Sequence, residues 1–156
     1  MNHSDIRWMQ RFQNFSRAFL LLQSALESRE LNEFSDLEQE GIIQRFEYTF
    51  ELAWKTLKDY LDYSDIILPE ATPRKVIKEC ASLNIFENAG IIPEIYLDML
   101  TSRNLLSHSY DLELFKREVK NIKEKYVYEL EKQHLFLSAK IAEIEEEGKS
   151  NEQSRT

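Results

Sequence analysis

The chain has 156 residues, 42% hydrophobic and 31% charged, which is the size and composition of one soluble globular domain with a core of its own. Its 3 glycines and 3 prolines are too few for the many turns of a β-sandwich or barrel, so a few long helices are favoured. A net charge of −8 repels nucleic acid on average, so any action on RNA requires a local basic region.

Membrane, secreted and zinc-binding classes are disfavoured as well. The longest apolar run, 18–22, is far too short to cross a bilayer, and the first ten residues lack the apolar core of a signal peptide. The single cysteine, Cys80, excludes an intrachain disulfide, and the three histidines are scattered without zinc-site spacing. We therefore expect a cytoplasmic protein that needs no metal or cofactor.

Two long amphipathic helices are predicted in the first half of the chain. In residues 5–27, apolar side chains recur at steps of three and four residues, the period of a helix packed along one face. Ser35 and Glu38 have the spacing of a capping box, which predicts that a second helix follows and runs to about Leu61. Tyr48 and Leu52 point away from its main apolar stripe, so either a short neighbouring helix or a second subunit covers them.

The second half begins with a short helix. Thr72 is a suitable cap and Pro73 a suitable first residue for a helix over 73–83, and residues 84–91 are predicted to form a loop. Pro93 then opens a helix that continues to Leu106.

The last helical region is predicted to start at Leu112, after the capping residue Asp111, and to reach about Glu146 with a break near Asn121. The polar residues 147–156 are predicted to be disordered. The sum is one all-α domain, residues 1–146, built as an antiparallel up-and-down bundle of four main helices plus a short one.

Arg103 lies unexpectedly on the apolar side of the helix predicted over 93–106. At about 100° per residue it falls among the apolar side chains of that helix, which are Ile92, Ile95, Tyr96, Met99, Leu100 and Leu106. A guanidinium in an apolar interface is costly unless it is paired or borders a cleft. Two interpretations stand: a structural arginine paired with Glu47 or Glu51 of the second helix, or a functional one in a cleft.

His108 follows Arg103 by five residues, about 140° around an ideal helix, so the two side chains meet only if the helix ends near His108 or a second chain contributes. A histidine can accept or donate a proton near neutral pH, and an arginine can stabilise a phosphorane-like transition state. Asn104, one turn before His108, can orient its ring or hold phosphate, and Tyr110 can bind phosphate or stack on a base. This set fits metal-free RNA cleavage, although a histidine at a helix end is more often a dipole partner.

The stretch RNLLSHSY, residues 103–110, resembles the Arg-X4-His-X-Tyr motif of the HEPN superfamily, in its HepT-like branch of nucleotidyltransferase substrate-binding proteins. QRFEYTFELAWKTLKDYL at 44–61 is more characteristic still, and IRWMQRFQNFSRAFLLLQSAL and TPRKVIKECASLNIF are also similar to that branch. The resemblance implies a two-fold dimer in which the motifs of both chains face a shared cleft.

The resemblance also implies an activity and a partner. The activity is that of a metal-independent endoribonuclease, the toxin of a type VII-like toxin–antitoxin pair, with Arg103 and His108 as the catalytic pair. The partner is a nucleotidyltransferase antitoxin that transfers AMP to Tyr110. Asn104 matches a polar residue common after the motif arginine.

Three functions stay open on this sequence. The first is the ribonuclease, and the second is a non-catalytic subunit in which Arg103 and Asn104 hold a nucleotide or acidic substrate for a nucleotidyltransferase. The third is a degenerate dimeric scaffold, which the intact motif disfavours. The lysine-rich stretch 115–125 is either the basic surface for RNA or a solvated helix face, since glutamates are interspersed in it.

Overall fold

The computed structural model describes residues 3–155, with side chains from residue 5 onward, and every regular element in that range is a helix. The elements are α1 (His3–Glu27), the 3₁₀ turn η1 (Leu31–Glu33), α2 (Asp36–Tyr63), α3 (Pro73–Ser82), α4 (Ile85–Ala89), α5 (Pro93–Leu106), α6 (Leu112–Asn121), the π-helical segment η2 (Ile122–Tyr126) and α7 (Val127–Ser154). The predicted all-α class is therefore confirmed.

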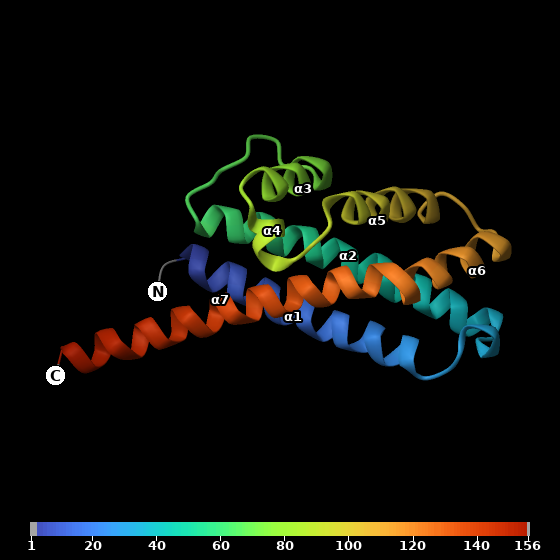
Figure 1. Ribbon diagram of the computed structural model, residues 1–156, viewed down its shortest axis with the longest axis horizontal. Coiled ribbons are helices and arrows are strands. Elements are labelled where there is room, and N and C mark those ends of the chain that lie inside the picture. The colour runs from blue at the N-terminus through green and yellow to red at the C-terminus, as the bar shows by residue number, and fades with distance from the viewer. Residues whose placement is uncertain (1–2, 156) are drawn as a thin grey trace.

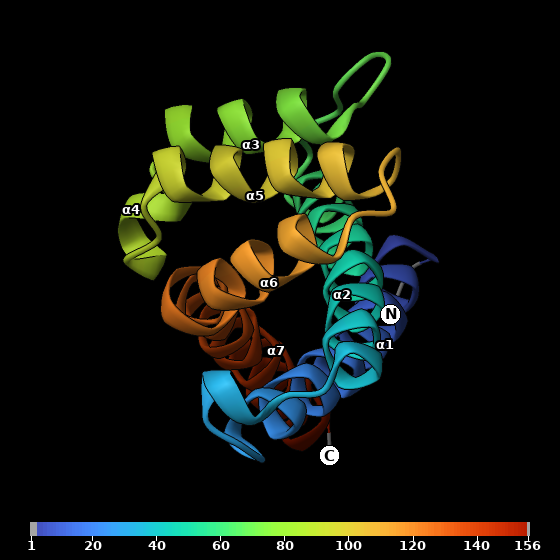
Figure 2. The same cartoon turned by 90° about the vertical axis from the view of Figure 1, so that its right-hand side faces the viewer.

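The helices are arranged around α2, which runs antiparallel to α1 with α7 packed across both (Figure 1). Seen from the end, α3 and α5 lie side by side in an upper layer, and α6 connects this layer to α7 (Figure 2). The core between these layers is rich in rings, and its largest fully buried side chains include Trp8, Phe15, Phe19, Phe46, Phe50, Phe86 and Tyr96. This packing fixes α2 from both sides, so its remaining faces are rigidly placed.

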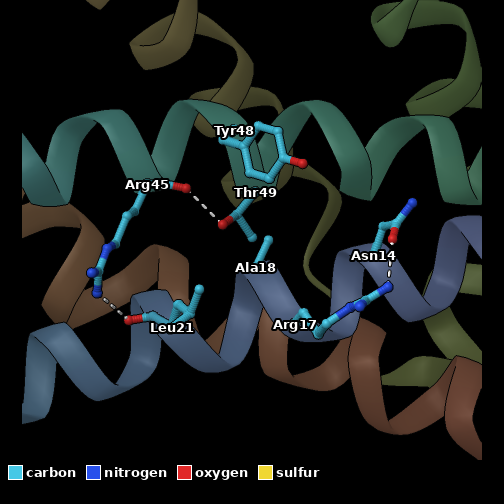
Figure 3. A pocket seen from close by; sticks show the side chains of 7 residues that line it. All are labelled: Asn14, Arg17, Ala18, Leu21, Arg45, Tyr48 and Thr49. Carbon is cyan, nitrogen blue, oxygen red and sulfur yellow. Dashed lines mark hydrogen bonds between the residues drawn. The ribbon is translucent and has the colours of Figure 1, made fainter.

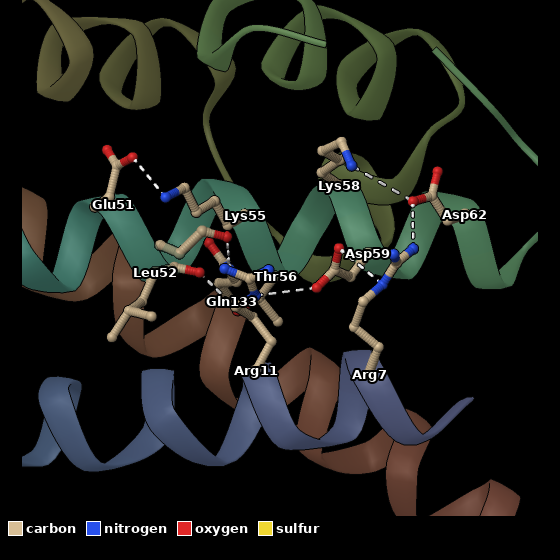
Figure 4. A network of polar contacts seen from close by, with 11 residues as sticks. Arg7, Arg11, Glu51, Leu52, Lys55, Thr56, Lys58, Asp59, Asp62 and Gln133 are labelled. Atoms are coloured by element: carbon tan, nitrogen blue, oxygen red, sulfur yellow. Dashed lines mark hydrogen bonds and ion pairs between the residues drawn. The ribbon is translucent and has the colours of Figure 1, made fainter. Parts of the chain in front are cut away.

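Ion pairs add to this packing between α1 and α2 (Figure 4). Asp59, 3% exposed, accepts from Arg11 at 3.1 Å and lies 3.8 Å from Arg7, which also bonds Asp62 at 3.1 Å. A buried carboxylate must have such partners, because its ionised form is otherwise costly in the interior. The pairs fix the register of α2 against α1.

The predicted caps form as expected. Ser35 and Glu38 make a reciprocal capping box at the start of α2, and the Thr72 hydroxyl accepts from the Lys75 N–H at the start of α3. The break predicted near Asn121 is the π-helical segment η2, which joins α6 to α7 without interrupting the helix.

The loop predicted over 84–91 is wrong for its centre, because residues 85–89 form the helix α4. Asn84 and Gly90 both adopt left-handed backbone, with φ of 62° and 75°, and so delimit a single turn. The Ile91 N–H closes it by donating to the Phe86 carbonyl at 2.8 Å, and Phe86 is fully buried. One buried ring is too short a pattern to show helical periodicity in the sequence.

The structure continues α7 to Ser154, across most of the segment predicted to be disordered. The side chains of residues 145–155 are all exposed, so packing does not hold this part of the helix. Its glutamates, lysine and glutamine lose little side-chain freedom in a helix, which favours continuation from the packed part of α7. The division into a domain of residues 1–146 and a tail stays a prediction.

Two further properties concern the part of the chain between residues 3 and 155. None of its helices is both long and apolar enough to cross a membrane. It also contains no group of three or more His, Cys, Asp or Glu side chains that could hold a metal ion.

Candidate functional site

The motif segment, residues 103–110, spans the end of α5 and the turn before α6. The Ser107 N–H donates to the Arg103 carbonyl at 3.1 Å, and the His108 N–H donates to the Leu105 carbonyl at 3.2 Å as the helix ends. Asp111 then caps α6, because its carboxylate accepts from the Glu113 and Leu114 N–H groups. The helix end predicted near His108 is therefore confirmed.

Arg103 faces α2 from inside the bundle, with 24% of its side chain exposed. Its Nη2 lies 3.6 Å from Oε2 of Glu51, and its guanidinium carbon lies 5.7 Å from the centre of the Phe50 ring. Pairing with Glu51, one of the two interpretations of this arginine, is thus observed. The Nε atom is buried and has no hydrogen-bond partner among the described residues, so the guanidinium keeps one unsatisfied donor.

Three carboxylates of α2 form a row along the motif segment. Glu51 pairs with Arg103, Glu47 accepts from the Ser107 hydroxyl at 3.4 Å, and Glu40 accepts from the Tyr110 hydroxyl at 2.5 Å. Separations of seven and four residues place all three on one helix face. We call Glu40, Glu47 and Glu51 the acidic row.

The acidic row is not electrostatically uniform. Burial raises the pKa of Glu47, and the Ser107 hydrogen bond and the charge of Arg103 offset this only in part. Burial opposes ionisation of Glu51 too, but hydrogen bonds from Trp54 and Lys55 and the charges of Lys55 and Arg103 lower its pKa overall. The row therefore places the carboxylates of Glu47 and Glu51 near Arg103, the one arginine of the motif segment.

Tyr110 is the tyrosine of the motif segment and is highly accessible, with 78% of its surface exposed. Its ring meets Phe115 edge to face, with centroids 5.5 Å apart, so the phenol is held from the side of α6. The hydrogen bond to Glu40 raises the pKa of the phenol. A reagent or enzyme can reach the hydroxyl without any rearrangement of the core.

His108 and Asn104 are both exposed, and neither side chain is hydrogen-bonded to another residue within 5–155. A single chain thus places Arg103, Ser107 and Tyr110 against α2 and leaves these two facing solvent. Of the acidic row, Glu47 and Glu51 were anticipated as partners of Arg103, whereas Glu40 was not. The signal for Glu40 is its position seven residues before Glu47, on the same face of α2.

The basic stretch 115–125 is partly committed to structure. Lys123 donates to the carbonyls of Leu26 and Arg29 at 2.9 and 2.7 Å, which satisfies the C-terminal end of α1. Arg117 lies 3.6 Å from the buried carboxylate of Glu118. Lys116, Lys120 and Lys125 are the lysines of this stretch that face solvent.

A groove of about 320 Å³ lies between α1 and α2, and its lining residues belong neither to the acidic row nor to the motif segment (Figure 3). It is lined by Asn14, Arg17, Ala18, Leu21, Arg45, Tyr48 and Thr49. Tyr48 is 62% exposed, so no neighbouring helix of the same chain covers it, although Leu52 is partly buried. Either a short neighbouring helix or a second subunit was expected to cover this face. The structure shows that no short helix covers Tyr48.

A search of curated proteins finds no match to the chain. A family model described as "Nucleotidyltransferase substrate binding protein like" matches residues 10–139, a range that holds the motif segment, the acidic row and Phe115. The family name implies association with a nucleotidyltransferase. With most of its length covered by this model, the chain belongs to the nucleotidyltransferase substrate-binding protein-like family.

Proposed function

We propose that the protein is the toxin of a type VII-like toxin–antitoxin pair, a metal-independent endoribonuclease that acts in the cytoplasm as a homodimer. Its antitoxin is a nucleotidyltransferase that silences it by transferring AMP to Tyr110. The observation that carries the proposal is Arg103, a half-buried guanidinium with an unsatisfied donor, fixed at the helix end that presents an exposed histidine. Family membership supports the association with a nucleotidyltransferase.

The proposed chemistry is transfer of the RNA phosphodiester to its own 2′-hydroxyl. The 2′-oxygen attacks the adjacent phosphorus, the bond from phosphorus to the 5′-oxygen breaks, and a 2′,3′-cyclic phosphate forms. His108 takes a proton from the 2′-hydroxyl or gives one to the leaving oxygen. Arg103 stabilises the extra negative charge of the transition state, and Asn104 and Tyr110 bind the substrate strand.

Glu51 sets a condition for this reaction. The carboxylate lies against Arg103 at 3.6 Å, where a phosphate oxygen has to bind. An RNA phosphate must therefore displace Glu51 from the guanidinium, and the pair acts as a competitor built into the site. Because both side chains are partly exposed, such a pair is weak and can be exchanged for a phosphate.

The test is the variant His108→Ala with end-labelled RNA in the presence of EDTA. Loss of a positioned acid–base group should lower the cleavage rate by about 10²- to 10⁴-fold. His134→Gln is the matched control, because it removes a histidine of α7 that bonds Ser16 of α1 and does not belong to the motif segment. Circular dichroism checks that both variants fold. Cleavage by His108→Ala at the rate of the parent would exclude this motif as the nuclease site.

The second candidate is the non-catalytic subunit, in which Arg103 and Asn104 hold a nucleotide or acidic substrate for the nucleotidyltransferase. It is favoured by the absence of any hydrogen bond between the His108 side chain and the other residues within 5–155. Under this alternative, His108→Ala leaves function intact, while Arg103→Ala lowers the affinity for the acidic ligand. The variants His108→Ala and Arg103→Ala therefore separate the two proposals.

A further inference from the structure

The phenol of Tyr110 carries its own proton acceptor. The Tyr110 hydroxyl donates to Oε1 of Glu40 at 2.5 Å, while the edge-to-face contact with Phe115 holds the ring. The other face of the phenol remains open, since 78% of the residue is exposed. An exposed nucleophile fixed in direct contact with a carboxylate is the arrangement in which protein kinases present a substrate hydroxyl to the aspartate that accepts its proton.

We propose that Glu40 is the general base for nucleotidylation of Tyr110, so that the modified chain supplies part of the catalytic machinery and the partner supplies the bound nucleoside triphosphate. The phenolic oxygen forms a bond to the α-phosphorus, the bond from that phosphorus to the β-phosphate oxygen breaks, and pyrophosphate leaves. The phenolic proton passes to Glu40 and then to water, because Glu40 is itself partly exposed. The product is a tyrosyl nucleoside monophosphate diester.

This inference rests on the proposed modification of Tyr110 and adds the residue that selects this tyrosine. The chain has seven tyrosines, and two others with large exposure, Tyr48 and Tyr128, form no hydrogen bond to a carboxylate of the described chain. Exposure alone therefore does not distinguish Tyr110 from these two tyrosines, whereas the hydrogen bond to Glu40 distinguishes it from both.

The experiment uses the full chain, the nucleotidyltransferase partner of the proposed function, α-labelled ATP and Mg²⁺, and follows label on Tyr110 by peptide mass spectrometry. Glu40→Gln keeps an oxygen that can accept the hydrogen bond but cannot take a proton, so the rate of labelling should fall by about 10²- to 10⁴-fold. Asp36→Asn is the matched control, because Asp36 is the other carboxylate whose charge acts on this phenol without bonding it. It should change the rate by less than about threefold.

Two readouts separate a base from a side chain that only positions the ring. In the parent, the labelling rate should fall toward acidic pH, whereas in Glu40→Gln this acidic limb should disappear. Without any partner, the carbon-13 signal of the Tyr110 ring should titrate at lower pH in Glu40→Gln than in the parent, because Glu40 raises the pKa of this phenol.

The outcomes distinguish the two proposals. If the parent is labelled on Tyr110 and Glu40→Gln is labelled equally fast, Glu40 is not the base, and the proposed modification stands. If Glu40→Gln is slow but keeps the acidic limb, Glu40 only positions the ring, and the inference is wrong. If the parent takes up no label while the partner still neutralises it, the covalent branch of the proposed function falls, and this inference with it.

Discussion

Arg103 is held between an anionic oxygen atom and an aromatic ring. Glu51 presents one anionic oxygen to Nη2, the Phe50 ring lies against the guanidinium, and Nε has no partner among the described residues. A guanidinium binds carboxylate and phosphate through the same planar fork of donors, so a carboxylate is a reasonable stand-in for a phosphate oxygen. The side chain is therefore arranged for a planar contact that a lysine cannot reproduce.

We expect Arg103→Lys to behave like Arg103→Ala in cleavage of RNA. Both should lower the rate by about 10²- to 10³-fold, the effect of losing one donor that stabilises transition-state charge. Arg117→Lys is the control, because Arg117 also pairs with a glutamate but lies on α6 with a 64% exposed side chain. Single-turnover rates with saturating protein are the measurement. A lysine variant that cleaves as fast as the parent would show that charge alone is needed.

The contacts of Arg103 and Tyr110 differ in how far the sequence predicts them. Arg103 lies inside a regular helix, so its angular position identifies α2 as the opposing surface and Glu47 or Glu51 as partners. Tyr110 lies beyond the end of α5, where backbone angles follow from turn geometry rather than from helical periodicity. Spacing along α2 places Glu40 on the same face as Glu47. It does not show that Tyr110, which lies beyond the end of α5, contacts Glu40.

At the level of elements, the turn between α5 and α6 is held at both ends. The Ser107 hydroxyl donates to the Arg103 carbonyl at 2.9 Å, and the Asp111 carboxylate satisfies two N–H groups at the start of α6. His108 and Tyr110 lie between these two anchors. The geometry of the motif thus depends on a helix cap that has no chemical role of its own.

Asp111→Ala should destabilise the protein by about 1 kcal/mol, the usual effect of losing an N-cap. Thr72→Ala is its matched control, because it removes the cap of α3, a helix that holds no motif residue, at a similar cost. Each should lower the melting temperature by about 2–4 °C, measured by calorimetry. Cleavage at 25 °C should fall in Asp111→Ala alone. Equal activity of the two variants would mean that the cap does not position His108.

Long helices were predictable here and short irregular ones were not. The ends of α2, α3 and α5 follow from Ser35, Pro73 and Pro93, which act through local hydrogen bonds and fixed backbone angles. The helix α4 depends instead on burial of Phe86 by elements distant in the chain. Extension of α7 to Ser154 depends on weak propensities that composition alone assigns to disorder.

The π-helical segment is the other irregular element. Residues Ile122–Tyr126 close with i to i+5 bonds and carry the backbone from α6 into α7 without a loop. The sequence marks the break near Asn121 but does not show that the helix continues through it.

At the scale of the whole molecule, the outer face of α2 is left uncovered. Tyr48 is 62% exposed beside a groove that Arg17, Leu21 and Arg45 also line. Arginine and tyrosine are enriched in protein interfaces, which are depleted in lysine and glutamate. This composition supports the proposed homodimer, formed through α5 and the outer face of α2.

We expect light scattering to show a dimer at micromolar concentration and Tyr48→Asp to convert it to a monomer, because a buried unpaired carboxylate disfavours association. Tyr128→Asp is the control, because Tyr128 is 54% exposed but lies on α7. If both chains contribute residues to the active site, the rate of RNA cleavage should also fall in Tyr48→Asp, because the dimer is lost. A monomeric parent, or a Tyr48→Asp variant that remains dimeric, would contradict this assembly.

The acidic row has a mechanical consequence, because its three members belong to a single rigid helix. From Glu40 to Glu51 the row spans about 16 Å of α2 at 1.5 Å per residue, and its members contact Tyr110, Ser107 and Arg103 in turn. The outer face of α2 around Tyr48 and the three contacts of the motif segment therefore belong to one rigid body. A second chain docked on that face is held at a fixed distance from Arg103 and Tyr110.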